Sequence, residues 1–308
     1  MELSEQEQAI LRLICYFDVL ALPLSWLDSL RLAGFKSDLP EIAGILESLK
    51  QKNIIERQDG LYFLSGKKIL LENKRRRQLI SAGLFKKTAL IGRALSYLPW
   101  VRGLAVYSSL SFANATEKSD IDLFVVAAAG RVWSARFFIN IFLKFFSLRP
   151  VAGKSSGKIC VSFLADENHL DLSKLKDNNE GHHYSYGETH FLFIYDEAGA
   201  GKKFFSDNGW ISVRFPNFYP CQAGLRRFIA PADKTIKKII ELCASIFPEK
   251  LLHRLQLRLL PPQIKKLEGR DWRVVLGDHL IKLHLSDRRE EIDKRTDDLI
   301  ENICDCAN

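Results

Sequence analysis

The sequence predicts an α+β protein in which a mixed β-sheet is flanked by helices. Two observations lead to this class. Apolar runs typical of strands cover residues 101–107, 120–126 and 158–164, and a helical pattern separates the last two. Segments with apolar residues at helical spacing occupy much of residues 5–98 and 234–302. The alternation of predicted strands and helices along the chain favours a layered structure in which helices pack on a mixed sheet.

The composition indicates a folded protein with more than one domain. The chain has 308 residues, of which 47% are hydrophobic, enough for two or three cores. No apolar run reaches the roughly 20 residues of a membrane-spanning helix, and the first residues lack a secretory signal pattern. We therefore expect a cytoplasmic protein with no membrane partner. Six scattered cysteines favour reduced thiols, and Cys304-x-Cys306 lacks the second pair of a zinc site.

Residues 1–66 predict three helices followed by a β-hairpin. Ser4 and Glu7 have the spacing of a capping box at the start of the first helix. Asp38 is expected to cap the third helix, and Gln58-Asp59-Gly60 is typical of a tight turn between two short strands. This order of elements resembles a winged-helix domain.

The charge is distributed unevenly along the chain. The formal net charge is +8, but residues 1–66 contain 6 Lys and Arg against 10 Asp and Glu, a balance of −4. Residues 67–308 therefore carry +12, and an anionic partner is expected to bind there. Proteins that bind duplex DNA normally present a basic surface. The acidic balance therefore disfavours DNA binding by the winged-helix-like domain and favours a protein contact or a spacer role, with DNA as the alternative.

Three further regions follow. Residues 67–98 predict a connecting helix that Pro99 ends. Residues 99–220 contain the predicted sheet, and residues 221–308 predict a C-terminal helical region. The connecting helix carries the basic run Lys74-Arg75-Arg76-Arg77, which fits either a contact with RNA or a triphosphate, or a solvated helix face.

Three further features of the central region bear on its fold and function. The helix predicted for residues 131–148 is rich in aromatic residues, and we expect it to be buried against the sheet. His182, His183 and His190 suggest zinc, but no nearby cysteine or carboxylate completes a ligand set. Gly153-Lys154-Ser155 is similar to the end of a P-loop, but it runs from a helix into a strand, whereas a P-loop runs from a strand into a helix.

One stretch combines two acids with a turn of small residues. Asp120 and Asp122 alternate on an otherwise apolar strand, so their side chains share one face of it. Two carboxylates on one face can hold a divalent metal ion. Ser108-Ser109 lies a short segment upstream, after another apolar strand, and offers hydroxyl and backbone N–H groups to a phosphate.

This pattern resembles the signature of the nucleotidyltransferase superfamily, which has the DNA polymerase β-like fold. The signature is a hydrophobic residue, Gly, then Gly or Ser, followed after a short gap by Asp-hydrophobic-Asp or Glu, and the match covers roughly residues 100–165. The resemblance implies a nucleotidyltransferase-type sheet and transfer of a nucleoside monophosphate (NMP) from a nucleoside triphosphate (NTP), with release of pyrophosphate. It also implies that Asp120 and Asp122 are catalytic and bind two Mg²⁺ ions, and that Ser108 and Ser109 bind the nucleotide.

Two positions depart from the family pattern. Ser108 stands where the family has Gly, which adds a Cβ where the backbone approaches the triphosphate. The third carboxylate of the family has no clear counterpart on the strand at residues 158–164. The polar residue there is Ser162, and Asp166 lies at or beyond the strand end.

Two functions therefore remain as hypotheses. The first is a Mg²⁺-dependent nucleotidyltransferase that acts on the hydroxyl or amine of an unidentified acceptor, a small molecule, a protein or an RNA. The second is a catalytically degenerate nucleotide-binding sensor or regulatory protein, whose winged helix contacts DNA or a protein partner.

Overall fold

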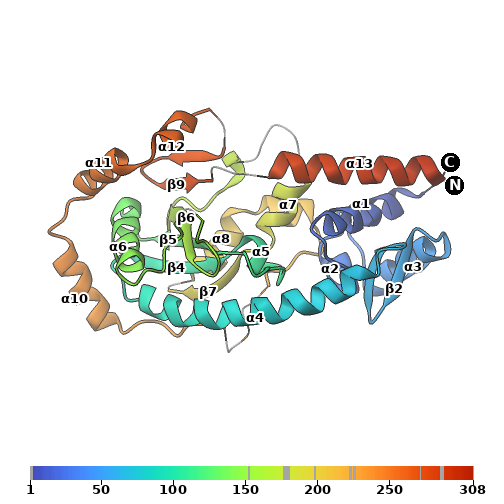
Figure 1. Cartoon of the computed structure of the whole chain (residues 1–308), viewed down its shortest axis with the longest axis horizontal. Coiled ribbons are helices and arrows are strands. Elements are labelled where there is room, and N and C mark those ends of the chain that lie inside the picture. The colour runs from blue at the N-terminus through green and yellow to red at the C-terminus, as the bar shows by residue number, and fades with distance from the viewer. Residues whose placement is uncertain are drawn as a thin grey trace.

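The computed structural model describes residues 3–151, 153–175, 181–197, 199–221, 224, 227–270, 272–284 and 288–307. It has a six-stranded sheet near its centre, a helical unit with a small sheet at one end and a further group of helices at the other (Figure 1). The predicted α+β class with a mixed sheet is confirmed. Within the described residues, no helix is long and apolar enough to cross a membrane.

The N-terminal unit contains three helices and a small antiparallel sheet. Ser4 and Glu7 form the predicted capping box, because each side chain accepts a hydrogen bond from the other residue's backbone N–H. Asp38 caps the third helix as predicted. Asp59 and Gly60 both have a positive φ, 53° and 74°, as a two-residue hairpin turn requires. The elements are α1 (Glu5–Val19), β1 (Leu24–Ser25), α2 (Trp26–Arg31), α3 (Leu39–Gln51), β2 (Ile55–Gln58) and β3 (Leu61–Leu64).

One long helix, α4 (Ile69–Leu95), leads from this unit to the central sheet, as predicted (Figure 1). Leu70 near its start is buried against Phe63 of the N-terminal unit. Ile91 and Leu95 near its end belong to the core of the sheet. The helix is therefore packed at both ends, and it fixes the N-terminal unit beside the sheet.

The central sheet has the strand order β7-β4-β5-β6-β9-β8. β5 and β6 are parallel, and all the other neighbouring pairs are antiparallel. A parallel pair needs a long crossover, which here includes α6 (Val132–Phe145). The strands are β4 (Val101–Val106), β5 (Ile121–Ala127), β6 (Ile159–Asp166), β7 (Leu192–Asp196), β8 (Val274–Leu276) and β9 (Leu280–Leu283).

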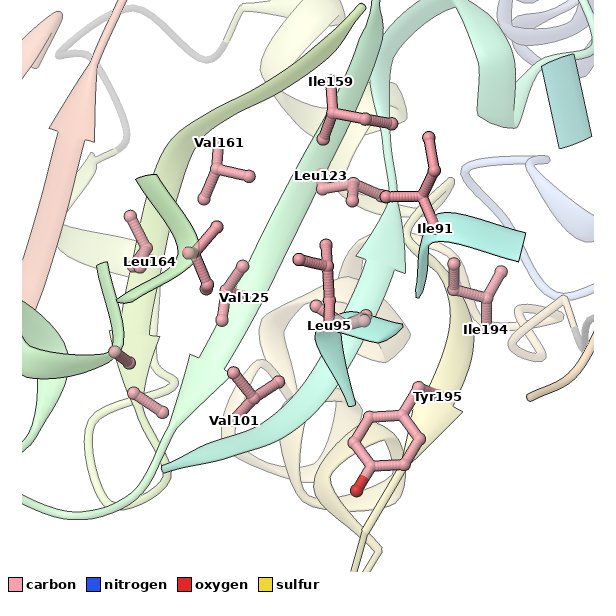
Figure 2. Packing of buried hydrophobic residues seen from close by; sticks show 14 of the residues in the cluster. Ile91, Leu95, Val101, Leu123, Val125, Ile159, Val161, Leu164, Ile194 and Tyr195 are labelled. Carbon is pink, nitrogen blue, oxygen red and sulfur yellow. The ribbon is translucent and has the colours of Figure 1, made fainter. Parts of the chain in front are cut away.

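Strand alternation gives the sheet two apolar faces. Leu123 and Val125 of β5 face a core shared with α4 and α6, part of which Figure 2 shows. Phe124 and Val126 face the opposite core. Short α-helices lie between β4 and the C-terminal region in the described part of the chain, and α7 and α8 contribute to the second core. They are α5 (Ser108–Ser111), α7 (His182–Glu188), α8 (Ala200–Asp207) and α9 (Trp210–Arg214).

The prediction that the aromatic helix is buried holds for only part of α6. Trp133 and Ile139 are buried in the core with α4. Phe145 and Phe146 at its C-terminal end are 80% and 55% exposed. Burial follows one face of a helix, so a sequence with aromatic residues on several faces leaves some of them in contact with solvent.

The predicted C-terminal helical region also supplies two strands. β8 and β9 form a hairpin, and β9 pairs with β6 at the edge of the central sheet. Ile292 and Thr296 of the last helix are buried rather than exposed, because this helix packs against α1 and α7. The helices in this region are α10 (Lys234–Ala244), α11 (Glu249–Leu259), α12 (Pro262–Leu267) and α13 (Arg289–Ala307).

Candidate metal and nucleotide site

Asp120 and Asp122 lie at the N-terminal end of β5. Asp122 is the second residue of the strand, and Asp120 immediately precedes it. Both side chains are half-buried. Asp122 shares the strand face of Phe124, which places its carboxylate at the edge of the second core rather than among the residues packed under α4.

The turn after β4 reaches the same place. β4 and β5 are antiparallel, with Val106 paired to Leu123, so the residues after β4 lie beside the residues before Leu123. The Tyr107 backbone N–H donates to the carbonyl of Asp122 at 3.3 Å. Ser108 follows with φ of +61°, a left-handed conformation that normally favours glycine. The structure therefore brings Ser108 next to Asp122.

Ser109 lies one residue further along, in the single turn of α5. Its side chain is half-buried, and its carbonyl accepts a hydrogen bond from the backbone of Asn114 at 2.9 Å. The side-chain hydrogen bonds to the Asp122 carboxylate come from Ser108 and Cys160, not from Ser109. Of the two predicted nucleotide-binding residues, Ser108 is the one that interacts with Asp122 in the part of the chain that the structure describes.

A thiol joins the two carboxylates. Cys160 of β6 is directly paired with Asp122 across the parallel strands. One ligand atom from each of Asp120, Asp122 and Cys160 lies within 4.8 Å of the other two. Carboxylate oxygen and thiol sulfur are both metal ligands, so this group of three, which we call the β5–β6 donor group, can hold a cation.

Burial dominates the electrostatics of this group. Burial and the neighbouring charge of Asp120 raise the pKa of Asp122 to about 7, although hydrogen bonds from Ser108 and Cys160 act in the opposite direction. Burial also raises the pKa of Asp120. Burial, followed by the charge of Asp122, raises the pKa of the Cys160 thiol to about 12. A bound cation would relieve these penalties, because an opposite charge favours the ionised forms.

Ser162 does not take the place of a third metal ligand. Its hydroxyl lies 3.0 Å from Nε2 of His284 and 3.3 Å from the Tyr107 hydroxyl, and those two atoms are 2.9 Å apart. The Tyr107 ring also stacks on Phe191, with centroids 5.4 Å apart. Ser162 thus belongs to a triangle of polar atoms beside the donor group.

Asp166, the other candidate for the third acid, lies far from the donor group. It pairs with Ala127, five residues along β5 from Asp122, a separation of about 17 Å at the usual rise of a strand. Its two oxygens lie 2.8 Å from Nδ1 of His169 and 2.7 Å from Nδ1 of His279. Burial acts to raise the pKa of Asp166, but these hydrogen bonds lower it overall. Asp166 therefore belongs to a second group of metal-ligand type, made with His169 and His279.

The three histidines that suggested zinc, His182, His183 and His190, do not come together. His182 lies 2.9 Å from Asp297, and Nδ1 of His183 lies 3.1 Å from the Tyr16 hydroxyl. The His190 ring stacks on Phe112, with centroids 3.8 Å apart. In the part of the chain that the structure describes, these histidines form no common group of ligand atoms.

Sequence reasoning missed Cys160, although a signal was present. Cys160 and Ser162 are two residues apart on one predicted strand, and period-two alternation places both on the same face. Cys160 was missed because only carboxylates were considered as the third metal ligand on this strand. His284 was also missed, because it follows β9, a strand of four residues with no clear sequence signal.

Comparison with known proteins gives no relative. No protein-family model, no curated protein and no solved structure matches the chain. The evidence for function is therefore the geometry of the β5–β6 donor group and of the turn beside it.

Proposed function

We propose that this protein is a metal-dependent nucleotidyltransferase, which moves an NMP from an NTP to an acceptor hydroxyl or amine and releases pyrophosphate. The observation that carries the proposal is the proximity of Ser108 to the Asp120 and Asp122 carboxylates across the antiparallel strands β4 and β5. A small-residue turn beside two acids is the arrangement that the nucleotidyltransferase resemblance implies.

The topology supports the same proposal. An antiparallel pair, β4 and β5, is followed by a parallel pair, β5 and β6, joined across a helix. This mixed sheet is compatible with a nucleotidyltransferase-type fold, and the three helices and hairpin of residues 1–66 are compatible with a winged helix. Arg76 and Arg77 of α4 reach the segment between Ser109 and Asp120, since they contact Glu117 and Asn114 at 2.7 Å. Two basic side chains of α4 therefore contact the loop that joins the two strands of the motif.

Each residue of the site has a role in the proposed nucleotidyl transfer. Asp120 and Asp122 would hold Mg²⁺ or a similar divalent ion, and the nucleotide phosphates would complete its oxygen ligands. Such an ion stabilises the attacking and leaving oxygens of phosphoryl displacement. Ser108 and Ser109 would bind the triphosphate through hydroxyl and backbone N–H groups. The Ser108 hydroxyl also orients the Asp122 carboxylate.

Transfer of label from NTP tests this function. The protein is incubated with each α-³²P-labelled NTP, Mg²⁺ or Mn²⁺, and a cell extract that supplies acceptors. We expect one NTP to label an acceptor and Asp122→Asn to abolish the label. Asp298→Asn, at an exposed position on α13, is the control and should retain it. Absence of label with every NTP would reject the transferase.

The position of Cys160 favours a second candidate function. Because a thiol rather than a third carboxylate accompanies the two acids, the alternative is a nucleotide-binding sensor that does not transfer the nucleotide. This alternative predicts NTP binding by calorimetry without release of pyrophosphate. Failure to bind any nucleotide would reject both functions.

A further inference from the structure

The position of Cys160 is set by the sheet. β5 and β6 are parallel, and Asp122 and Cys160 are register partners, so their side chains leave the sheet as neighbours on one face. The next pairing after this one skips a residue, since Phe124 pairs with Phe163. β6 therefore has one extra residue between Cys160 and Phe163, as in a β-bulge. This bulge follows Cys160 and does not change its pairing with Asp122.

The donor atoms have the spacing of a shared site. One carboxylate oxygen of Asp120, one of Asp122 and Sγ of Cys160 all lie within 4.8 Å of one another. Ligands at about 2.0 to 2.3 Å from one ion are separated by roughly 3 to 4 Å, so a small contraction brings all three into coordination. The group therefore offers two oxygen ligands and one sulfur ligand to a single ion.

The chemistry of the donor set then selects the ion. Mg²⁺ binds oxygen ligands and has little affinity for sulfur. Thiolate is a soft ligand, and it favours zinc and related transition ions. When such an ion replaces the proton of the thiol, the sulfur becomes an anionic ligand and the proton passes to solvent.

We infer that Cys160 is a direct metal ligand, and that the β5–β6 donor group takes a thiophilic transition ion, such as Zn²⁺ or Co²⁺, in preference to Mg²⁺. This inference rests on the proposed function for the presence of a metal at Asp120 and Asp122. It adds a sulfur ligand and a class of ion that the resemblance to nucleotidyltransferases does not imply.

Cobalt spectroscopy on the full chain tests the sulfur ligand directly. Co²⁺ bound to thiolate gives a charge-transfer absorption band in the near ultraviolet, which oxygen ligands do not give. The protein is titrated with Co²⁺ alone and with Co²⁺ plus a non-hydrolysable NTP. We expect the band in the wild type and its loss in Cys160→Ser. Cys243→Ser changes an exposed thiol on α10 and should leave the band unchanged.

A second variant tests the selection of the ion. Cys160→Asp replaces the thiol by a third carboxylate, and we expect the ratio of Co²⁺ to Mg²⁺ affinity to fall by about tenfold or more, since even the outer partners of metal ligands affect affinity on this scale. Circular dichroism establishes that each variant is folded. A band that survives in Cys160→Ser, or no band in the wild type under either condition, would overturn the inference.

The outcomes separate this inference from the proposed function. Label transfer supported by Mg²⁺ with unchanged efficiency in Cys160→Ser would overturn the sulfur ligand and retain the transferase. A cobalt band that depends on Cys160, without label transfer from any NTP, would retain the sulfur ligand and reject the transferase.

Discussion

Asp122 of β5 and Cys160 of β6 are direct partners in the parallel register, and a carboxylate oxygen of Asp122 lies within 4.8 Å of the Cys160 sulfur. Burial at the edge of an apolar core, followed by the neighbouring charge of Asp120, raises the pKa of Asp122 to about 7. Such an acid is a cost to folding in the absence of a cation, because the folded state binds its proton more tightly than the unfolded state does.

Asp122→Asn should therefore stabilise the protein at alkaline pH. The folded pKa of Asp122 is about 7, above the ordinary value of a carboxyl, so ionisation lowers wild-type stability as the pH rises from about 4 to about 7. In metal-free buffer we expect the variant to be more stable by about 2 to 4 kcal/mol at pH 8 and nearly equal at about pH 3.5. Urea unfolding at both pH values measures this difference, and equal stability at pH 8 would contradict it.

Ser108→Gly tests the left-handed turn. Ser108 has φ of +61°, which costs a residue with a Cβ about 1 kcal/mol relative to glycine. Ser108→Ala loses the same hydroxyl but keeps the Cβ, so it is the matched variant. We expect Ser108→Gly to be more stable than Ser108→Ala by about 1 kcal/mol in thermal and urea unfolding. The reverse order would show that the turn is not strained.

Glu7→Gln should weaken the N-terminal unit in a pH-dependent way. Burial acts to raise the pKa of Glu7, but hydrogen bonds from Lys52, Ser48 and the backbone of Ser4 lower it to about 2. A lowered folded pKa gives stability above the unfolded value, and this stability disappears as the pH falls towards 2. We expect a loss of about 2 kcal/mol at pH 7 and a much smaller loss at pH 2.5, from denaturant titrations.

Glu5→Gln is the control for this prediction. Glu5 is exposed in the first turn of the same helix, α1. The substitution should cost only a few tenths of a kcal/mol, the scale of a single charge near a helix terminus. Equal losses for the two variants would assign the effect to the helix rather than to the contacts of Glu7.

Lys237→Met tests the attachment of α10 to the sheet. The Lys237 ammonium is buried, and it donates to the Val101 carbonyl, to Glu197 and to the Tyr195 hydroxyl, the last at 3.0 Å. Removing one partner of a buried ion pair costs about 3 kcal/mol. Lys203→Met, which breaks an exposed pair with Asp207, should cost less than about 1 kcal/mol. Equal costs in urea unfolding would contradict a role for Lys237 in holding α10.

Much of the fold could be predicted from local sequence patterns. The caps at Ser4 and Asp38 and the turn at Asp59-Gly60 depend on neighbouring residues, and all three are confirmed. Strands β8 and β9 could not be predicted with the same reasoning. They have three and four residues, and β9 is a strand because it pairs with β6, more than a hundred residues away along the chain.

The candidate site shows the same division. Alternation along a single strand predicted that Asp120 and Asp122 share a face. Which residue of β6 lies beside Asp122 depends on the register between β5 and β6, and this register cannot be read from the pattern of either strand alone. The pairing of Asp122 with Cys160 puts a thiol beside the two acids, and Asp166, further along β6, lies with His169 and His279.

The contact between α1 and α13 has a consequence for the order of folding. Ile292 of α13 is buried in the same core as Ile14 and Phe17 of α1. During synthesis, the apolar face of α1 therefore leaves the ribosome long before its partner helix exists. The apolar face of α1 stays partly exposed until α13 has been synthesised. During this interval, association with other chains or with a chaperone competes with correct folding.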